Sequence, residues 1–584
     1  MASLYDMIIR NGLIVDGTGS EPYKGDLAIK GDRIAAIGKV DGSAAQEIDA
    51  AGQLVTPGFI DVHTHYDGQA IWSDRLNPSS AHGVTTVVVG NCGVGFAPCR
   101  EESRGMLISS MEGVEDIPEI VMVEGLTWEW ETFPEFLDAL EKRPHDINLA
   151  CYIPHSALRV YVMGDRGANR EDATPADIEA MVAITRNAME AGAVGFATSS
   201  TTFHRRIDGV PIASYQTAEP ELAAIAREVG RHGGIFQMVS RIAEDTDDQT
   251  CREDFEFLYR IAKHSQCAVT FTMAQADYAP TRLRRVMDWV EEANKEDGVV
   301  IKTQLYPRPV GMVLGLDISA NPFLERPTYK KIAALPLAEK VAELRKPEVR
   351  AKILGEESGV PTLPLMNMAR KFDQMYALGE NPNYEPDPED SVAKTAKRMG
   401  ITPDELAYDL FLERDGNAMM MVAMANLSYG NLDELHSQLQ RPDIMIGLGD
   451  GGAHYGLVCD SSYPTFMLGY WARDRKRGGF SVAEAVRMMS SVQARFMGFT
   501  DRGELAVGKR ADLNIIDIEG IRMHAPSVLK DLPGGGKRVD QTASGYRATI
   551  VGGRVIQRDG VPTGELPGKL LRAGRIGELA EAAE

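Results

Sequence analysis

Short runs of apolar residues recur along the middle of the chain, and most of them are bounded by Gly, Asn or Asp. They lie at 58–63, 85–90, 148–152, 194–198, 234–239, 268–271, 299–303 and 444–448. Each has the length of a buried strand rather than of a helix. Helix-like stretches separate them. Eight strands alternating with helices predict an α/β fold, a (β/α)8 TIM-like barrel, which we place at 58–499.

Two of the intervening stretches carry helix-start signals. Thr174 and Pro175 combine a capping residue with proline at the first helical position, and Gly192 is typical of the end of that helix. Ser481 and Glu484 have the spacing of a capping box. These signals predict a helix from 175 to 191 and another that begins at 482.

Both ends of the chain have a different texture, with short strands joined by tight turns. Asn11-Gly12, Asp16-Gly17 and Gly31-Asp32 separate apolar runs near the start, and Gly552-Gly553 does so near the end. We therefore predict a small β-sandwich domain formed by both termini, from 1–57 and 500–584.

The stretch at about 326–440 is too long for one crossover between barrel strands. Its pattern is mostly helical and polar, so we interpret it as a helical insertion that covers the barrel mouth. Residues 381–389 (NPNYEPDPE) are rich in proline and polar residues and predict a flexible segment. The methionine run at 419–421 is typical of a packed core or a subunit contact.

Composition narrows the class of protein. The chain has 584 residues, of which 44% are hydrophobic and 25% charged, and its net charge is −22. An acidic chain is a poor partner for nucleic acid or for an anionic membrane. The six cysteines form no CxxC pair, and the chain shows neither a signal peptide nor an apolar run near the ~20 residues of a membrane span. We expect a cytoplasmic enzyme.

The end of the first barrel strand carries His63-Thr64-His65. Residues i and i+2 of a strand point to the same side, so both imidazoles can reach one ion. Neutral imidazole is a common ligand of zinc. The alternative is a pair of structural loop histidines, but the position at a barrel strand end favours a metal site.

Two further strand ends add candidate ligands. Cys92 follows the second strand, where a thiolate can bind zinc or bridge two ions, or where the thiol can be a buried apolar group. Asp450 follows the eighth strand between glycines and can ligate the ion and also accept a proton from its water. The alternative for Asp450 is a turn aspartate.

Other polar side chains lie at the same end of the predicted barrel. His155 follows the third strand, and His454 follows Asp450 closely in sequence; each can contact the substrate or be a satisfied loop histidine. Residues 198–204, after the fourth strand, are polar and include His204, and we expect them to line the mouth.

Five segments together resemble the amidohydrolase superfamily, and within it the N-acyl-D-amino-acid deacylases. They are VTPGFIDVHTHYD, GNCG at Cys92, HSALR at His155, GDGGAH at Asp450 and RGELAVGKRADLNIID at 502–517. The resemblance covers nearly the whole chain outside the insertion. It implies a barrel with a β-sandwich from both termini, bound zinc and hydrolysis of an amide. By residue matching it implies His63, His65 and Cys92 as metal ligands and Asp450 as the catalytic base.

The chain departs from this family where the fifth and sixth strands end. The family has a metal histidine at each, but 236–241 (FQMVSR) and 270–275 (TFTMAQ) contain none, and no lysine is present there to bridge two ions. We therefore expect one Zn²⁺ per subunit, held by His63, His65 and Asp450, with Cys92 near it or bound to it.

The family's anchors for the substrate carboxylate also differ. The basic residue expected after the sixth-strand histidine is absent. Tyr306-Pro307-Arg308 matches the family's tyrosine-containing loop, so Arg308 can supply the missing positive charge, or it can be a salt-bridge arginine. Tyr306, His155 or His454 can stabilise the oxyanion.

These observations favour a metal-dependent hydrolase of a C–N bond whose partner is a small-molecule amide, such as an N-acyl amino acid. The first alternative is hydrolysis of a cyclic amide or a lactone on the same scaffold. The second is a non-catalytic assembly scaffold, which retention of the four candidate ligands disfavours. A homo-oligomer is expected for a barrel of this kind.

Overall fold

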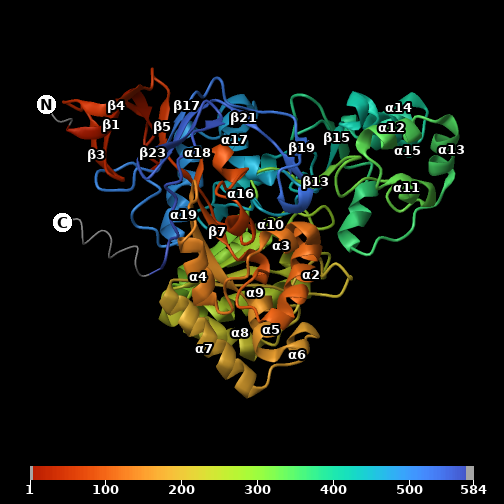
Figure 1. The fold of residues 1–584 in the computed structure, drawn as a ribbon, viewed down its shortest axis with the longest axis horizontal. Helices are drawn as coiled ribbons and strands as arrows, with labels where there is room; N and C mark the ends of the chain where they lie inside the picture. Colours follow the sequence, from red (N-terminus) through yellow and green to blue (C-terminus); the bar gives the residue numbers. More distant parts are fainter. Residues whose placement is uncertain (1–3, 574–584) are drawn as a thin grey trace.

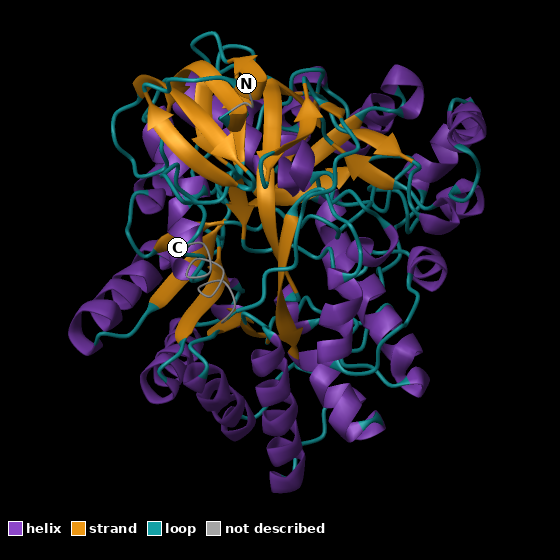
Figure 2. Ribbon diagram, turned by 60° about the vertical axis from the view of Figure 1, so that its left-hand side comes forward, coloured by secondary structure: helices purple, strands orange, loops and turns teal. Residues whose placement is uncertain are grey.

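A computed structural model describes residues 4–573. Its centre is an eight-stranded parallel sheet in the order β16-β12-β11-β10-β9-β8-β7-β6, which curls into a barrel (Figures 1 and 2). The strands are β6 (Phe59–Asp61), β7 (Val84–Val89), β8 (Asn148–Pro154), β9 (Gly195–Ser199), β10 (Ile235–Val239), β11 (Ala268–Met273), β12 (Ile301–Leu305) and β16 (Ile444–Ile446). The predicted α/β barrel is confirmed, and each predicted strand overlaps an observed one.

Backbone hydrogen bonds join the two ends of this sheet. The Asp450 amide donates to the His63 carbonyl oxygen over 3.1 Å, and the His65 amide donates to the Gly451 carbonyl oxygen over 2.7 Å. These residues follow β16 and β6 directly. The seam of the barrel is therefore closed by the segments that carry three of the predicted ligands.

Helices surround the barrel strands, as the purple ribbons in Figure 2 show. Both predicted helix starts are confirmed: Thr174 and Asp177 form a capping box, as do Ser481 and Glu484. The larger helices of the barrel are α2 (Arg104–Glu115), α4 (Phe133–Glu141), α5 (His155–Met163), α7 (Pro175–Ala191), α8 (Glu219–Arg231), α9 (Asp248–Ser265), α10 (Arg282–Asp297), α16 (Asp433–Leu439) and α18 (Val482–Met489).

Both ends of the chain build one nine-stranded sheet, seen at the upper left of Figure 1. The early strand β5 pairs with the late strand β17, and buried aliphatic side chains from both ends share one core. The strands are β1 (Tyr5–Ile14), β2 (Tyr23–Lys30), β3 (Arg33–Gly38), β4 (Ala44–Asp49), β5 (Leu54–Pro57), β17 (Leu513–Ile516), β22 (Tyr546–Val551), β23 (Arg554–Arg558) and β24 (Val561–Pro562).

The insertion forms a lobe with its own core, drawn in green at the right of Figure 1. A three-stranded antiparallel sheet of β13 (Val310–Leu314), β15 (Met419–Ala425) and β14 (Met375–Leu378) joins it to the barrel. The methionine run at 419–421 is therefore the central strand of this sheet. The helices of the lobe are α11 (Pro327–Ile332), α12 (Leu337–Leu344), α13 (Pro347–Gly355), α14 (Val392–Met399) and α15 (Pro403–Phe411).

The structure differs from the prediction of a flexible segment at 381–389. Tyr384 is buried, and its hydroxyl accepts a hydrogen bond from the Gln541 side chain. Glu385 forms an ion pair with Arg475 over 2.9 Å. The proline-rich composition predicts only the behaviour of the isolated segment. Gln541 and Arg475, which hold the segment in place, lie far from it in the sequence.

Across residues 4–573, no helix combines the length and the apolar character that crossing a membrane would require.

The separate core of the insertion predicts independent local unfolding. Phe323 is 1% exposed and packs against Tyr329, Tyr408 and Phe411. Phe323→Ala should destabilise the lobe by about 3–5 kcal/mol because it leaves a cavity. Hydrogen exchange should then accelerate in the lobe while the barrel strands stay protected. The matched control is Val360→Ala, at an 87% exposed position of the same lobe; equal acceleration in the barrel would contradict the prediction.

Candidate metal centre and active site

The two histidines after β6 are buried, and the Nδ1 atom of each lies near a polar side chain from another part of the barrel. His63 Nδ1 lies 2.7 Å from the Gln304 side-chain oxygen, and His65 Nδ1 lies 3.4 Å from Glu115 Oε1. An acceptor at Nδ1 fixes the ring and places the proton there, which leaves Nε2 free as a ligand. Gln304 in β12 therefore prepares the His63 imidazole for a metal, whereas Glu115 at the end of α2 lies beside His65 Nδ1 without a hydrogen bond to it.

Cys92 completes a cluster of three possible ligands. Its Sγ lies 3.3 Å from His63 Nε2 and 3.7 Å from His65 Nε2. All three ligand atoms lie within 4.8 Å of one another. The turn that presents the thiol begins at Gly90, with φ of +82°, where a Cβ would overlap the carbonyl oxygen of Tyr152. Steric crowding therefore accounts for glycine at position 90, the first residue of the GNCG segment.

Asp450 approaches the imidazoles from the eighth strand. Its Oδ1 lies 3.8 Å from His63 Nε2 and 3.7 Å from His65 Nε2. Burial alone would raise the pKa of Asp450, but its interactions with His65, His63 and His454 lower it to about 2. The side chain is 20% exposed. It is therefore an ionised carboxylate within reach of solvent.

The spacing of these atoms suits zinc. Metal–ligand bonds of about 2.0–2.3 Å in a tetrahedron give ligand–ligand edges of about 3.3–3.8 Å. The separations of Cys92 Sγ and of Asp450 Oδ1 from the two Nε2 atoms, 3.3 to 3.8 Å, match those edges, and the three ligand atoms of His63, His65 and Cys92 form a compact group. Two imidazoles, a thiol and a carboxylate are also donor types that zinc accepts.

The charge balance of the site points the same way. Burial raises the pKa of Asp61 to about 8 and that of Asp67 to about 7, and it raises the pKa of Glu115 and of the Cys92 thiol well above their usual values. Within residues 4–573, Asp61, Asp67 and Glu115 form no ion pair with Lys or Arg, and the ion-pair contacts of Glu115 are with His65 and His454. A bound divalent cation would favour the ionised forms of these groups and so lower their pKa values.

His454 and His204 lie beside the cluster. His454 Nε2 is 3.4 Å from Glu115 Oε2, so one carboxyl group contacts both His454 and His65. His204 Nδ1 is 2.8 Å from Ser199 Oγ. Burial and the nearby His454, His65 and His63 lower the pKa of His204 to about 3. The centroids of the His454 and His65 rings are 6.5 Å apart, so His454 lies next to the candidate ligands.

Three other predicted site residues are engaged with the protein itself. His155 is buried, with Nδ1 2.8 Å from Thr198 Oγ1 and Nε2 2.8 Å from Glu221 Oε1. The Tyr306 hydroxyl donates to the Asp460 carbonyl oxygen over 3.0 Å. Arg308, 2% exposed, pairs with Asp460 over 2.9 Å. These side chains hold the loops around the site in this structure.

The sequence alone did not identify Glu115 and Gln304 as residues of the site, for different reasons. Glu115 ends a helix far from any strand motif, so nothing local distinguishes it. Gln304 is a buried polar residue of the seventh barrel strand, β12, and attention to polar residues in predicted buried strands could have singled it out.

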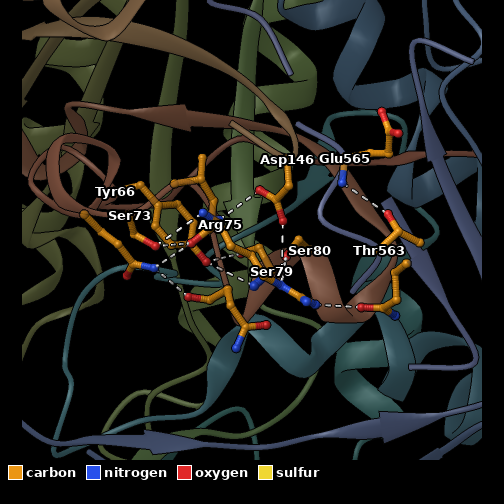
Figure 3. A network of polar contacts seen from close by, with 12 residues as sticks. Tyr66, Ser73, Arg75, Ser79, Ser80, Asp146, Thr563 and Glu565 are labelled. Carbon is orange, nitrogen blue, oxygen red and sulfur yellow. Dashed lines mark hydrogen bonds and ion pairs between the residues drawn. The ribbon is translucent and has the colours of Figure 1, made fainter. Parts of the chain in front are cut away.

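A polar network supports the loop that follows His65 (Figure 3). The Tyr66 hydroxyl donates to Ser79 Oγ over 2.8 Å, and Asp146 Oδ1 accepts from the Leu76 amide over 2.9 Å. Arg75 donates to the side chain of Gln557 in β23 over 2.7 Å. The terminal sheet is thereby tied to the segment behind the candidate ligands.

A cavity of about 410 Å³ lies where this site meets the insertion. Its walls come from the loops after β9, β10 and β11, from β13 and β15, and from the insertion. His204 belongs both to this wall and to the surroundings of the candidate ligands.

The sequence of this chain is similar to that of a known protein family. The model of the amidohydrolase family matches residues 46–557, which is most of the chain. The chain belongs to the amidohydrolase family. The matched range includes His63, His65, Cys92 and Asp450, and it spans the insertion.

Two curated members of this family align with almost the whole chain. D-aminoacylase of Alcaligenes xylosoxydans xylosoxydans is 26% identical over 572 residues, covering 97% of each chain. N-acyl-D-glutamate deacylase of the same organism is 25% identical over 590 residues, covering 100% of this chain and 99% of its own.

Solved structures of this family share the fold. N-acyl-D-glutamate deacylase of Bordetella bronchiseptica, crystallised with zinc and a phosphonate inhibitor, has a TM-score of 0.64 and 25% identity and covers 97% of this chain and 100% of its own. A D-aminoacylase structure described by its binuclear metal centre has a TM-score of 0.65 and 24% identity, with the same coverage. The barrel with its terminal sheet is thus the fold of these amidohydrolases.

The turn before Cys92 provides a test of the local geometry. Gly90→Ala should destabilise the protein by more than the roughly 1–2 kcal/mol of a left-handed residue, because its Cβ also meets the Tyr152 carbonyl. Gly233→Ala is the matched control, since Gly233 has φ of +66° and open space around it. Denaturant unfolding measures both variants; equal losses of stability would show that the turn can relax.

Proposed function

We propose that this amidohydrolase-family protein is a zinc-dependent hydrolase of a linear amide, acting through one ion per subunit. The observation that carries the proposal is the compact group of His63, His65 and Cys92, with Asp450 Oδ1 within 3.8 Å of both imidazoles. The absence of histidine from β10 and β11 supports one ion rather than two.

His63 Nε2, His65 Nε2 and Cys92 Sγ would hold the ion, with Asp450 beside it, whereas the sequence favoured His63, His65 and Asp450 as its ligands. When bound, zinc lowers the pKa of a water molecule and polarises the scissile carbonyl. Asp450 accepts a proton from the attacking water and then donates it to the amide nitrogen as the C–N bond breaks. The products are a carboxylic acid and an amine.

The surrounding residues have supporting roles in this proposal. Gln304 keeps the His63 imidazole proton on Nδ1 and so keeps Nε2 turned to the ion, and Glu115 lies beside His65 Nδ1. His454 and His204 are the imidazoles beside the cluster that can donate to the carbonyl oxygen as it gains negative charge. His155, Tyr306 and Arg308 position the loops that carry these groups.

Metal content and activity together test the roles of Asp450 and Cys92. Asp450→Asn should keep zinc and lose about 10²–10⁴-fold in kcat, because the proton acceptor is removed. Cys92→Ala should lose zinc affinity at least tenfold as one donor disappears. Elemental analysis and hydrolysis of a panel of N-acyl amides, cyclic imides and lactones give both readouts.

The matched control for these variants is His232→Asn, on the protein surface, which should change neither zinc content nor kcat. Wild-type protein that binds no zinc would refute the proposal. Loss of zinc from Asp450→Asn would make Asp450 an essential ligand rather than the base alone. Preference for cyclic imides or lactones would replace the linear amide.

The support from Gln304 can be tested separately. Gln304→Met removes the acceptor for His63 Nδ1–H at similar volume and should weaken zinc binding or activity by about 10–100-fold. Gln304→Glu retains an acceptor oxygen and should keep most of the affinity. Competition with a chelator measures both; equal losses would mean that the hydrogen bond has no such role.

A further inference from the structure

The cavity beside the candidate ligands is the place where a substrate group can lie. His204 is part of its wall, and so is Leu448, two residues before Asp450. His204 Nδ1 lies 2.8 Å from Ser199 Oγ at the end of β9, on the same side of the barrel as the candidate ligands. The cavity therefore lies between the strand ends that carry the candidate ligands and the insertion.

Apolar side chains dominate the wall. They come from both sides of the cavity: Met273 and Leu448 from the barrel, Met424 from β15, and Met368 from the insertion. Flexible thioether side chains adapt to ligands of different shape, and a mainly apolar wall favours an apolar ligand group. The insertion thus contributes directly to recognition.

The charged groups in the same wall are unsuited to an anion. Three of them are acidic, Glu244, Asp245 and Asp277, and the single lysine, Lys371, is exposed. Glu244 accepts hydrogen bonds from the Thr202 amide over 2.8 Å and hydroxyl over 2.6 Å, and Asp277 accepts from Gln374. Carboxylate recognition in proteins usually relies on arginine or lysine held in place.

The buried arginines nearby already serve protein acceptors. Arg282 donates to backbone oxygens of 242, 244 and 246. Arg308 pairs with Asp460 and donates to Ser462 Oγ over 3.0 Å. Neither belongs to the cavity wall. Among the described wall residues there is therefore no buried cation to hold a carboxylate.

We propose that this cavity binds an apolar, uncharged group attached to the scissile amide, so that neutral amides rather than free N-acyl amino acids are the substrates. The proposal rests on the amide hydrolysis proposed above. It sets this chain apart from relatives whose names specify acidic N-acyl amino acids, such as the N-acyl-D-glutamate deacylase.

A pair of ligands that differ only in the carboxylate tests the proposal. N-acetyl-2-phenylethylamine is N-acetylphenylalanine without its carboxyl group. With zinc-loaded, full-length protein, kcat/KM for the neutral compound should exceed that for either enantiomer of the acid at least tenfold. Equal values, or preference for the acid, would overturn the proposal.

Binding separates this question from catalysis. Calorimetric Kd values for both compounds on the Asp450→Asn protein should show the same preference of at least tenfold. If neither compound is hydrolysed but the neutral one binds more tightly, the amidase function fails while the cavity assignment stands. If the acid binds as tightly, the cavity assignment fails.

Charge variants test whether this cavity determines the preference for the neutral compound. Met424→Lys places a cation in the cavity and should shift the ratio of Kd values at least tenfold toward the acid. Val360→Lys, on the exposed surface of the insertion, is the matched control and should leave the ratio unchanged. Lys371→Met should also leave it unchanged; a drop in affinity for the acid would show that Lys371 anchors carboxylates, contrary to the proposal.

Discussion

Closure of the barrel is the constraint on which the rest of this structure depends. The hydrogen bonds from Asp450 N to His63 O and from His65 N to Gly451 O join the first and last strand ends. They also fix the separation between the imidazoles and the carboxylate. Because one set of backbone contacts does both, the candidate ligands can be well placed only when the whole barrel is formed.

Strained backbone accompanies this arrangement. Cys92, Leu448, Asp450 and His454 all have positive φ, between 46° and 66°. Each such residue costs roughly 1–2 kcal/mol relative to an ordinary conformation. Strain of this kind persists where surrounding packing over-determines the chain, and it clusters at functional sites. The large buried core beneath the strand ends supplies that packing.

Local patterns were enough to predict much of the molecule. The eight apolar runs and the caps at Thr174 and Ser481 reflect short-range chemistry. The positions of His63, His65, Cys92 and Asp450 after barrel strands predicted that these residues lie close together. Contacts between residues that are far apart in the sequence could not be predicted from local patterns. Glu115 reaches the histidines from a helix end, and Tyr384 is held by Gln541, so composition near either residue carries no signal of its partner.

The terminal sheet has a consequence for biosynthesis. β5 cannot meet β17 until almost the entire polypeptide has left the ribosome, because the two strands come from opposite ends of the chain. Until then β5 presents an unpaired edge, which invites association with other nascent chains. Pairing of such distant strands is slow, since a long loop must close first. Chaperone demand during synthesis should therefore be highest just before the last strands emerge.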